Sequence, residues 1–222
     1  MLAQHAAYAD GLRALGLQVE VLDSLPGFPD AYFVEDVAVV VPELAVVARP
    51  GAASRRGEAD AIVPALARYR EVARLEHPAT LDGGDVLIVG HCVFIGISAR
   101  TNEEGADQLA RFLRPHGYDS RTIPVAAGLH LKSSVSWVGG ETLLVSASFA
   151  DRPELRSFRR VVVDANEEPA CNTLLVNGTL LTPSGFPRTR RQLDQTQLPV
   201  IELDVSEARK MDGGLTCMSL RL

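Results

Sequence analysis

The sequence lacks a long hydrophobic run and carries little clustered positive charge. No stretch reaches the ~18 consecutive apolar residues of a membrane span, and the first fifteen residues lack the basic start and unbroken apolar stretch of a secretory signal. The formal net charge is -6, whereas a nucleic-acid backbone attracts a positive surface. RTRR at 188–191 and SRR at 54–56 are short basic clusters. We therefore expect a cytoplasmic protein with no nucleic-acid or membrane partner.

Cysteine is also scarce. Cys92, Cys171 and Cys217 lie far apart, with no CxxC pair and no histidine at metal-ligand spacing, so we predict neither a disulfide framework nor a metal site. Cys92 and Cys171 lie in apolar segments and are predicted to be small buried hydrophobic residues. Cys217 instead follows a glycine-rich turn five residues from the end of the sequence, and is the candidate reactive thiol.

Phosphate-binding glycine motifs and flexible linkers are absent as well. The two glycine-pair loops, Asp82-Gly83-Gly84-Asp85 and Asp212-Gly213-Gly214, fit neither GxGxxG nor GxxxxGK[ST], and each alone could be a simple turn. The composition is 46% hydrophobic and 23% charged over 222 residues, which is ordinary for a globular protein. Without a Pro/Gly/Ser-rich linker, we predict a single catalytic domain over residues 1–222.

The apolar pattern predicts short strands alternating with helices. We expect a helix over 2–15 that ends at Gly16, and then a strand over 17–22. A Val-rich hairpin is predicted over 31–50, and a helix over 57–69 despite Pro64. The sequence VLIVGHCVFIGIS predicts a second hairpin, followed by a helix that ends at Gly117 and begins with a Thr101-x-x-Glu104 capping box.

Two more hairpins are predicted, one turning at Gly139-Gly140 and one within CNTLLVNGTLLTP. Hairpin, helix and further strand therefore recur at intervals of about forty residues. Such repetition favours a propeller-like array of ββαβ modules. An open α+β sheet would give the same string of elements, and periodicity alone does not separate the two.

Adjacent acids and a histidine are further candidates for chemistry. Glu35 and Asp36 lie in an apolar segment read as a strand, where they would point to opposite faces. A buried carboxylate needs a cationic partner, which a ligand can supply; Glu35 would be solvated if the strand lay at an edge. His130 opens a Ser-rich strand entry, although an isolated histidine is more often structural than catalytic.

Taken in order, seven segments resemble the dimethylarginine dimethylaminohydrolases, members of the guanidino-group-modifying (pentein) superfamily. The segments are FPDAYFVED, RPGAASRRGE, LDGGDVL, ISARTNEEGA, GLHLKSSVSW, ACNTLLVN and MDGGLTCMSLRL. The resemblance runs from about Leu12 to Leu222. It implies an α/β fold, a five-bladed propeller of ββαβ modules, with the first blade incomplete because the family's N-terminal strand and lid loop have no counterpart here.

The same resemblance implies hydrolysis of free methylated arginine to citrulline and dimethylamine or methylamine, without a cofactor. It implies Cys217 as nucleophile, His130 as acid/base and Asp82 as its acidic partner. The implied substrate-binding residues are Asp30, Glu35, Asp36, Arg55, Arg100 and Met211. The small-molecule substrate is the one partner implied, and the sequence leaves the oligomeric state open, a homodimer included.

Residue chemistry agrees with this reading. A guanidinium carbon is a poor electrophile, so its attack requires a polarisable nucleophile such as a thiolate. Carboxylates can hold the planar guanidinium, and Arg55 and Arg100 would suit the α-carboxylate of a free amino acid. Three rival functions stay open: an arginine deiminase, an amidinotransferase of the same superfamily, and a non-catalytic arginine-binding protein.

Overall fold

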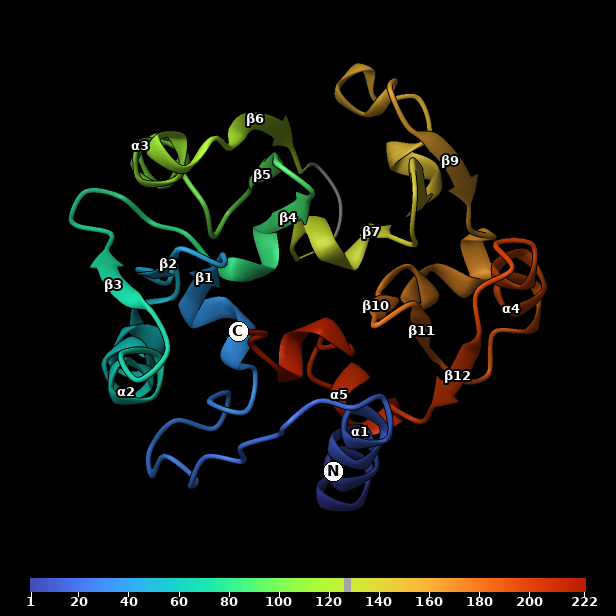
Figure 1. Ribbon diagram of the computed structural model, residues 1–222, viewed down its shortest axis with the longest axis horizontal. Coiled ribbons are helices and arrows are strands. Elements are labelled where there is room, and N and C mark those ends of the chain that lie inside the picture. The colour runs from blue at the N-terminus through green and yellow to red at the C-terminus, as the bar shows by residue number, and fades with distance from the viewer. Residues whose placement is uncertain (126–128) are drawn as a thin grey trace. The chain divides into compact units, whose positions relative to one another are not determined.

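The computed structural model describes residues 1–125 and 129–222. Its described strands form four three-stranded sheets, each made of an antiparallel hairpin and a third strand parallel to the second (Figure 1). This repeated unit confirms the module predicted from the sequence. The chain divides into two compact units, one of residues 1–22 and 132–216 and the other of residues 23–131 and 217–222. The single catalytic domain stays a prediction.

The unit of residues 23–131 and 217–222 begins with a 3-10 helix, η1 (Val34–Val37), and a Val-rich sheet. The strands of this sheet are β1 (Ala38–Val40), β2 (Leu44–Val47) and β3 (Glu71–Arg74). The 3-10 helix η2 (Ala53–Arg55) and helix α2 (Arg56–Leu66) lie between β2 and β3 in the chain. Ala45 and Val47 pack with Ile62 and Leu66 of α2. Pro64 lies inside α2 near its C-terminal end, where its missing N–H removes one i→i−4 hydrogen bond.

The second sheet of this unit carries the LDGGD loop at its start. Its elements are 3-10 helix η3 (Gly83–Asp85), β4 (Val86–Val89), β5 (Cys92–Ile97), α3 (Glu103–Leu113), 3-10 helix η4 (Arg114–His116) and β6 (Asp119–Pro124). The predicted capping box is wrong: Asn102 caps α3 by accepting from the Gly105 N–H at 2.8 Å. The Thr101 hydroxyl instead donates to Asp85. Gly117 ends the helical segment at φ +86°, as predicted.

The unit of residues 1–22 and 132–216 holds the other two sheets. The third contains β7 (Val135–Trp137), β8 (Thr142–Val145) and β9 (Arg159–Val162), after 3-10 helix η5 (Leu131–Ser133); 3-10 helices η6 (Ala147–Phe149) and η7 (Pro153–Leu155) lie between β8 and β9. The fourth contains β10 (Leu174–Val176), β11 (Thr179–Pro183), α4 (Pro187–Asp194) and β12 (Val200–Leu203), after 3-10 helix η8 (Ala165–Cys171). Leu144, Cys171, Leu180 and Leu193 share one core. Cys171 is therefore the buried hydrophobic residue that its sequence context predicts.

The same unit contains α1 (Leu2–Ala14) and α5 (Ser206–Arg209). Helix α1 buries Tyr8 and Leu12, as the predicted spacing requires, and Gly16 follows it at φ +86°. The predicted strand over 17–22 is wrong, because that segment pairs with no other strand in the described chain and Val21 is largely exposed. No strand is assigned among residues 15–37.

Glu35 and Asp36 are also placed differently from the prediction. They lie on η1 and not on a strand, so the alternation argument does not apply to them. Both side chains are buried, and the solvated alternative for Glu35 is therefore wrong as well. Within the part of the chain that the structure describes, no helix combines the length and apolar character of a membrane span.

Candidate active site

The LDGGD loop packs directly against η1 and His130. A Cβ on Gly83 would come within 2.0 Å of the Glu35 carbonyl oxygen, and one on Gly84 within 2.6 Å of His130 Nδ1 and 2.8 Å of Asp36 Oδ1. Neither glycine has positive φ. This glycine pair is therefore required for close approach of the backbone to the Glu35 carbonyl, the Asp36 carboxylate and His130, and not for a tight turn.

His130 lies between two carboxylates. Its Nε2 is 3.0 Å from Asp82 Oδ2 and its Nδ1 is 3.8 Å from Asp36 Oδ1, with all three side chains buried. Burial alone would lower the pKa of His130, but the Asp82 hydrogen bond and the charges of Asp36, Asp85 and Asp82 raise it above the ordinary 6.5. The imidazole therefore holds its proton to higher pH than a free histidine does.

Asp36 and Asp82 are each fixed by the protein. Asp36 Oδ1 accepts from the Gly84 N–H at 3.1 Å, and its Oδ2 accepts from Arg55 at 2.5 Å. Asp82 Oδ1 accepts from the Gly51 N–H at 2.9 Å, which leaves Oδ2 for His130. The structure thus brings the predicted acid/base residue and its predicted partner together, with Asp36 as a second carboxylate.

Arg55 is engaged within the protein. Its Nε and a terminal nitrogen donate to Glu58 at 3.0 and 2.7 Å, the other terminal nitrogen donates to Asp36, and the carbonyls of Asp30 and Phe33 accept further bonds. Burial alone would lower the pKa of Arg55, but the bonds to Glu58 and Asp36 raise it further above its already high value. In this structure Arg55 supports Asp36, and its predicted contact with the substrate carboxylate stays a prediction.

Arg100 differs from Arg55. Its side chain is half-buried and makes no hydrogen bond or ion pair with the described residues, while its backbone N–H donates to Ser98 Oγ at 3.0 Å. A Cβ on Gly51 would come within 2.4 Å of the Arg100 carbonyl oxygen, so the Arg100 loop packs tightly on residue 51. Arg100 therefore has a guanidinium that is free to bind an anion.

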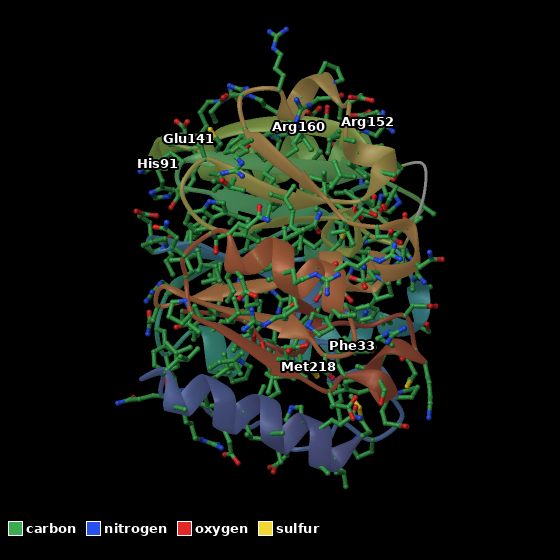
Figure 2. The ribbon with its side chains drawn as sticks, turned by 90° about the vertical axis from the view of Figure 1, so that its right-hand side faces the viewer. Phe33, His91, Glu141, Arg152, Arg160 and Met218 are labelled. Carbon is green, nitrogen blue, oxygen red and sulfur yellow. The ribbon has the colours of Figure 1, made fainter. Side chains whose placement is uncertain are left out.

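Cys217 lies in the 3-10 helix η9 (Thr216–Met218), half-buried, and belongs to the same compact unit as His130. Tyr32 interacts with it electrostatically: burial first, and then the electrostatic effects of Asp30 and Cys217, raise the pKa of the Tyr32 hydroxyl. In Figure 2 the label Phe33 marks the residue directly before η1, and the label Met218 marks the residue directly after Cys217. Asp30 itself is half-buried.

Met211 belongs to the other compact unit, where it follows α5 and is exposed. Its predicted contact with substrate stays a prediction. Gly128 of the GLHLK motif lies outside the described residues.

Several supporting residues were not singled out by sequence reasoning. Glu58 could have been found from its i, i+3 spacing to Arg55. Asp85 lies inside the quoted LDGGD motif, but nothing in the sequence separates its role from that of Asp82. Asn172 is a third case: its side chain accepts from the Thr216 N–H at 2.9 Å and donates to the Lys132 carbonyl at 3.0 Å. Only the fold brings those segments together.

The arrangement suits a cationic ligand. Donor atoms of Asp36, Asp82 and His130 lie within 4.8 Å of one another, a spacing that would also admit a metal ion. We assign no metal here, because His130 Nε2 is engaged with Asp82 and its Nδ1 is beside a carboxylate that Arg55 already neutralises. A planar organic cation needs no free imidazole nitrogen as a ligand, and therefore fits this donor set better.

Comparison with known proteins agrees with the geometry. A sequence model of N,N dimethylarginine dimethylhydrolase, eukaryotic, matches residues 1–168. The N(G),N(G)-dimethylarginine dimethylaminohydrolase of Pseudomonas aeruginosa is 39% identical over 222 residues, which cover 99% of this chain and 87% of that protein.

Solved structures give the same result. A mutant of the Pseudomonas aeruginosa enzyme in complex with citrulline has a TM-score of 0.98 and 38% identity, covering 100% of this chain and 88% of its own. The N-terminal domain of ArgZ, an arginine dihydrolase from Cyanobacteria, reaches a TM-score of 0.90 over 99% of this chain and 85% of its own, but at 19% identity it shows the fold alone. The pentein fold class predicted from the sequence is thereby confirmed. Because the family model matches most of the chain and the relative matches nearly all of it, the chain belongs to the dimethylarginine dimethylaminohydrolase family.

Proposed function

We propose that this protein hydrolyses free Nω-methylated arginine to citrulline and dimethylamine or methylamine. The observation that carries the proposal is the buried His130, whose two nitrogens face Asp82 and Asp36, in the compact unit that also holds Cys217. The named activity of the Pseudomonas aeruginosa relative and the citrulline bound to its mutant support the same substrate class.

In the first step the Cys217 thiolate attacks the guanidinium carbon and forms a C–S bond. The bond from that carbon to the methylated nitrogen then breaks, and His130 donates a proton to the departing amine. The raised pKa of His130 favours the protonated form that this step requires. The product is a covalent S-alkylthiouronium on Cys217 and one molecule of methylamine or dimethylamine.

In the second step water attacks the thiouronium carbon and His130, now neutral, accepts a proton from it. The C–S bond breaks, the thiolate of Cys217 is restored, and loss of the second proton of the water to solvent leaves the neutral urea group of citrulline. The imidazole thus returns to its starting charge. The hydrogen bond that Asp82 accepts from the imidazole orients the ring in both steps.

The charged groups divide between the two ends of the substrate. Asp36 lies beside His130 and is ordered by Arg55 and the Gly84 N–H, so it can accept from the guanidinium without moving. Arg100 has the free guanidinium for the α-carboxylate. Contacts of Asp30, Glu35 and Met211 with the substrate belong to the same proposal.

The deciding experiment compares asymmetric dimethylarginine with arginine as substrate and measures citrulline and the amine released. We expect citrulline and dimethylamine from the first, and their loss in Cys217→Ser, whereas Cys92→Ser retains turnover as a matched cysteine control. Ammonia from arginine alone would indicate a deiminase, and transfer to an added amine would indicate an amidinotransferase. Citrulline formation by Cys217→Ser at the native rate would refute the proposal.

Two predictions complete this proposal. A cytoplasmic location would be tested by cell fractionation. A homodimer would be tested by sedimentation of the purified protein.

A further inference from the structure

Asp85 is a fully buried carboxylate next to the catalytic histidine segment, and no step of the reaction uses it. Its exposure is 0%. Asp85 Oδ2 accepts from Ser98 Oγ at 2.6 Å and from Thr101 Oγ1 at 2.7 Å, and its Oδ1 accepts from the Leu131 N–H at 2.9 Å. A buried charge is costly unless hydrogen bonds compensate for the lost water, and these three donors do so for Asp85.

The hydrogen bonds show which form of Asp85 the site holds. Ser98 Oγ already accepts from the N–H groups of Arg100 and Thr101, so its own proton is directed at Asp85. Thr101 Oγ1 likewise accepts from the Asp82 N–H at 3.1 Å and donates onward. Each of these hydrogen-bond partners of the carboxylate is therefore a donor. A protonated Asp85 would find no acceptor among these three groups, which favour the ionised form.

Each of these donors leads to a functional group. Through Thr101, Asp85 holds the backbone of Asp82, the partner of His130. Through Ser98, it holds the backbone of Arg100. Its bond to the Leu131 N–H fixes the residue directly after His130. These three hydrogen-bonded connections start from the Asp85 carboxylate and reach His130, its partner Asp82, and Arg100.

Gly96 of β5 packs closely against the Asp85 carboxylate. A Cβ on Gly96 of β5 would lie 2.9 Å from Asp85 Oδ1 and 3.0 Å from the Leu131 Cβ. The carboxylate therefore has little room to turn away from the Leu131 N–H. Its position is determined by β5, η3 and the segment at Leu131 together.

We propose that Asp85 is a positioning residue that aligns His130, Asp82 and Arg100 through its hydrogen bonds. The proposal rests on the proposed function, since it assigns His130 the role of acid/base.

The negative charge of Asp85 also acts on His130. The charged groups that face His130 are Asp82 and Asp85 from the LDGGD loop and Asp36 from η1, and each of them raises the pKa of His130 against the effect of burial. Burial raises the pKa of Asp85 itself, while His130 and the three hydrogen bonds oppose that rise. The two groups thus stabilise each other's charged forms.

The test uses Asp85→Asn, which keeps the shape of the side chain and removes its charge. The readouts are kcat and KM across pH with asymmetric dimethylarginine, and the imidazole pKa of His130 by NMR, assigned with His130→Gln. We expect kcat to fall about tenfold or more. We also expect the alkaline limb of the kcat–pH profile and the imidazole pKa of His130 to move down by about one pH unit. Asp60→Asn, an exposed acid of α2, is the charge control and should change neither.

A purely structural residue would lower the melting temperature without moving the imidazole pKa. A folded Asp85→Asn protein whose His130 pKa and kcat match the native protein would overturn the proposal. The NMR titration needs no substrate, so it separates this inference from a failure of the proposed function.

If Asp85→Asn does not fold, Thr101→Val and Ser98→Ala decide the question. Both keep the charge of Asp85, and each cuts one of its links. We expect Thr101→Val to lower kcat through the Asp82 backbone, and Ser98→Ala to raise KM through the Arg100 loop, while the His130 pKa changes less than in Asp85→Asn. Native kcat and KM in both variants would refute the positioning role.

Discussion

Replacing Arg55 with alanine separates two roles for this residue. In the structure its guanidinium lies between Asp36 and Glu58, with both carboxylates 4% exposed. Arg55→Ala would leave these two carboxylates buried without their cation. If Arg55 instead served the substrate carboxylate, its removal would weaken substrate binding and leave the fold largely intact.

The structure sets the size of the expected effect. Removing one partner of a buried ion pair typically costs about 3–5 kcal/mol of unfolding free energy. For a chain of this length each kcal/mol corresponds to roughly 2–4 °C in melting temperature, which gives a decrease of roughly 6–20 °C. Arg56→Ala is the matched control: its Nε reaches the Pro50 carbonyl at 3.3 Å, and we expect a change within about 0.5 kcal/mol.

The assay is thermal unfolding followed by circular dichroism, together with KM for asymmetric dimethylarginine at a temperature where the variant is folded. We expect a large fall in melting temperature and a fall in kcat, because Asp36 loses its support. Adding Glu58→Gln to the variant should recover part of the stability, since it removes one unpaired charge. A melting temperature within the Arg56→Ala range, together with a raised KM, would refute the assigned role of Arg55.

Three further predictions concern His130, Gly84 and Asn172. Because the pKa of His130 is raised, the alkaline limb of the kcat profile should lie above the ordinary histidine value of 6.5; a limb at or below that value would contradict the electrostatics. Gly84→Ala should abolish turnover, because its Cβ would lie 2.6 Å from His130 Nδ1, whereas Gly11→Ala in α1 has 3.6 Å to its nearest neighbour and should stabilise the protein by about 0.5–1 kcal/mol in a thermal melt. Asn172→Ala should destabilise by about 1–3 kcal/mol in denaturant unfolding and lower kcat, because it removes the two hydrogen bonds between the Asn172 side chain and Thr216; native kcat would contradict this.

The sequence predicts the repeated module well because the module depends on local signals. Alternating Val and Leu runs with Gly at the turns specify the hairpins, and the four predicted hairpin turns occur in the structure. The wrong strand over 17–22 shows the limit of this reasoning. A strand exists only when another strand pairs with it, and no sequence pattern within residues 17–22 reports whether that partner is present.

The site is less predictable because its geometry comes from contacts between distant segments. Asp36 and Gly84 are 48 residues apart, and so are Asp82 and His130. Glu35 and Asp36 fall on a 3-10 helix although their neighbours favour a strand, and this turn is what directs Asp36 at His130. The capping error at Thr101 has the same origin, since its hydroxyl is used by Asp85.

The buried charge of the site explains which ligand it can take and which product it can release. In the described part of the unit that contains His130, the buried acids outnumber the buried cations. The acids are Glu35, Asp36, Glu58, Asp82 and Asp85, against Arg55 and His130. A guanidinium offsets this excess of negative charge, and methylation leaves its charge in place while it removes N–H donors from one nitrogen. Citrulline carries a neutral urea in place of the cation. Hydrolysis therefore removes the charge that held the substrate, and the site loses its electrostatic attraction for the product as soon as the product forms.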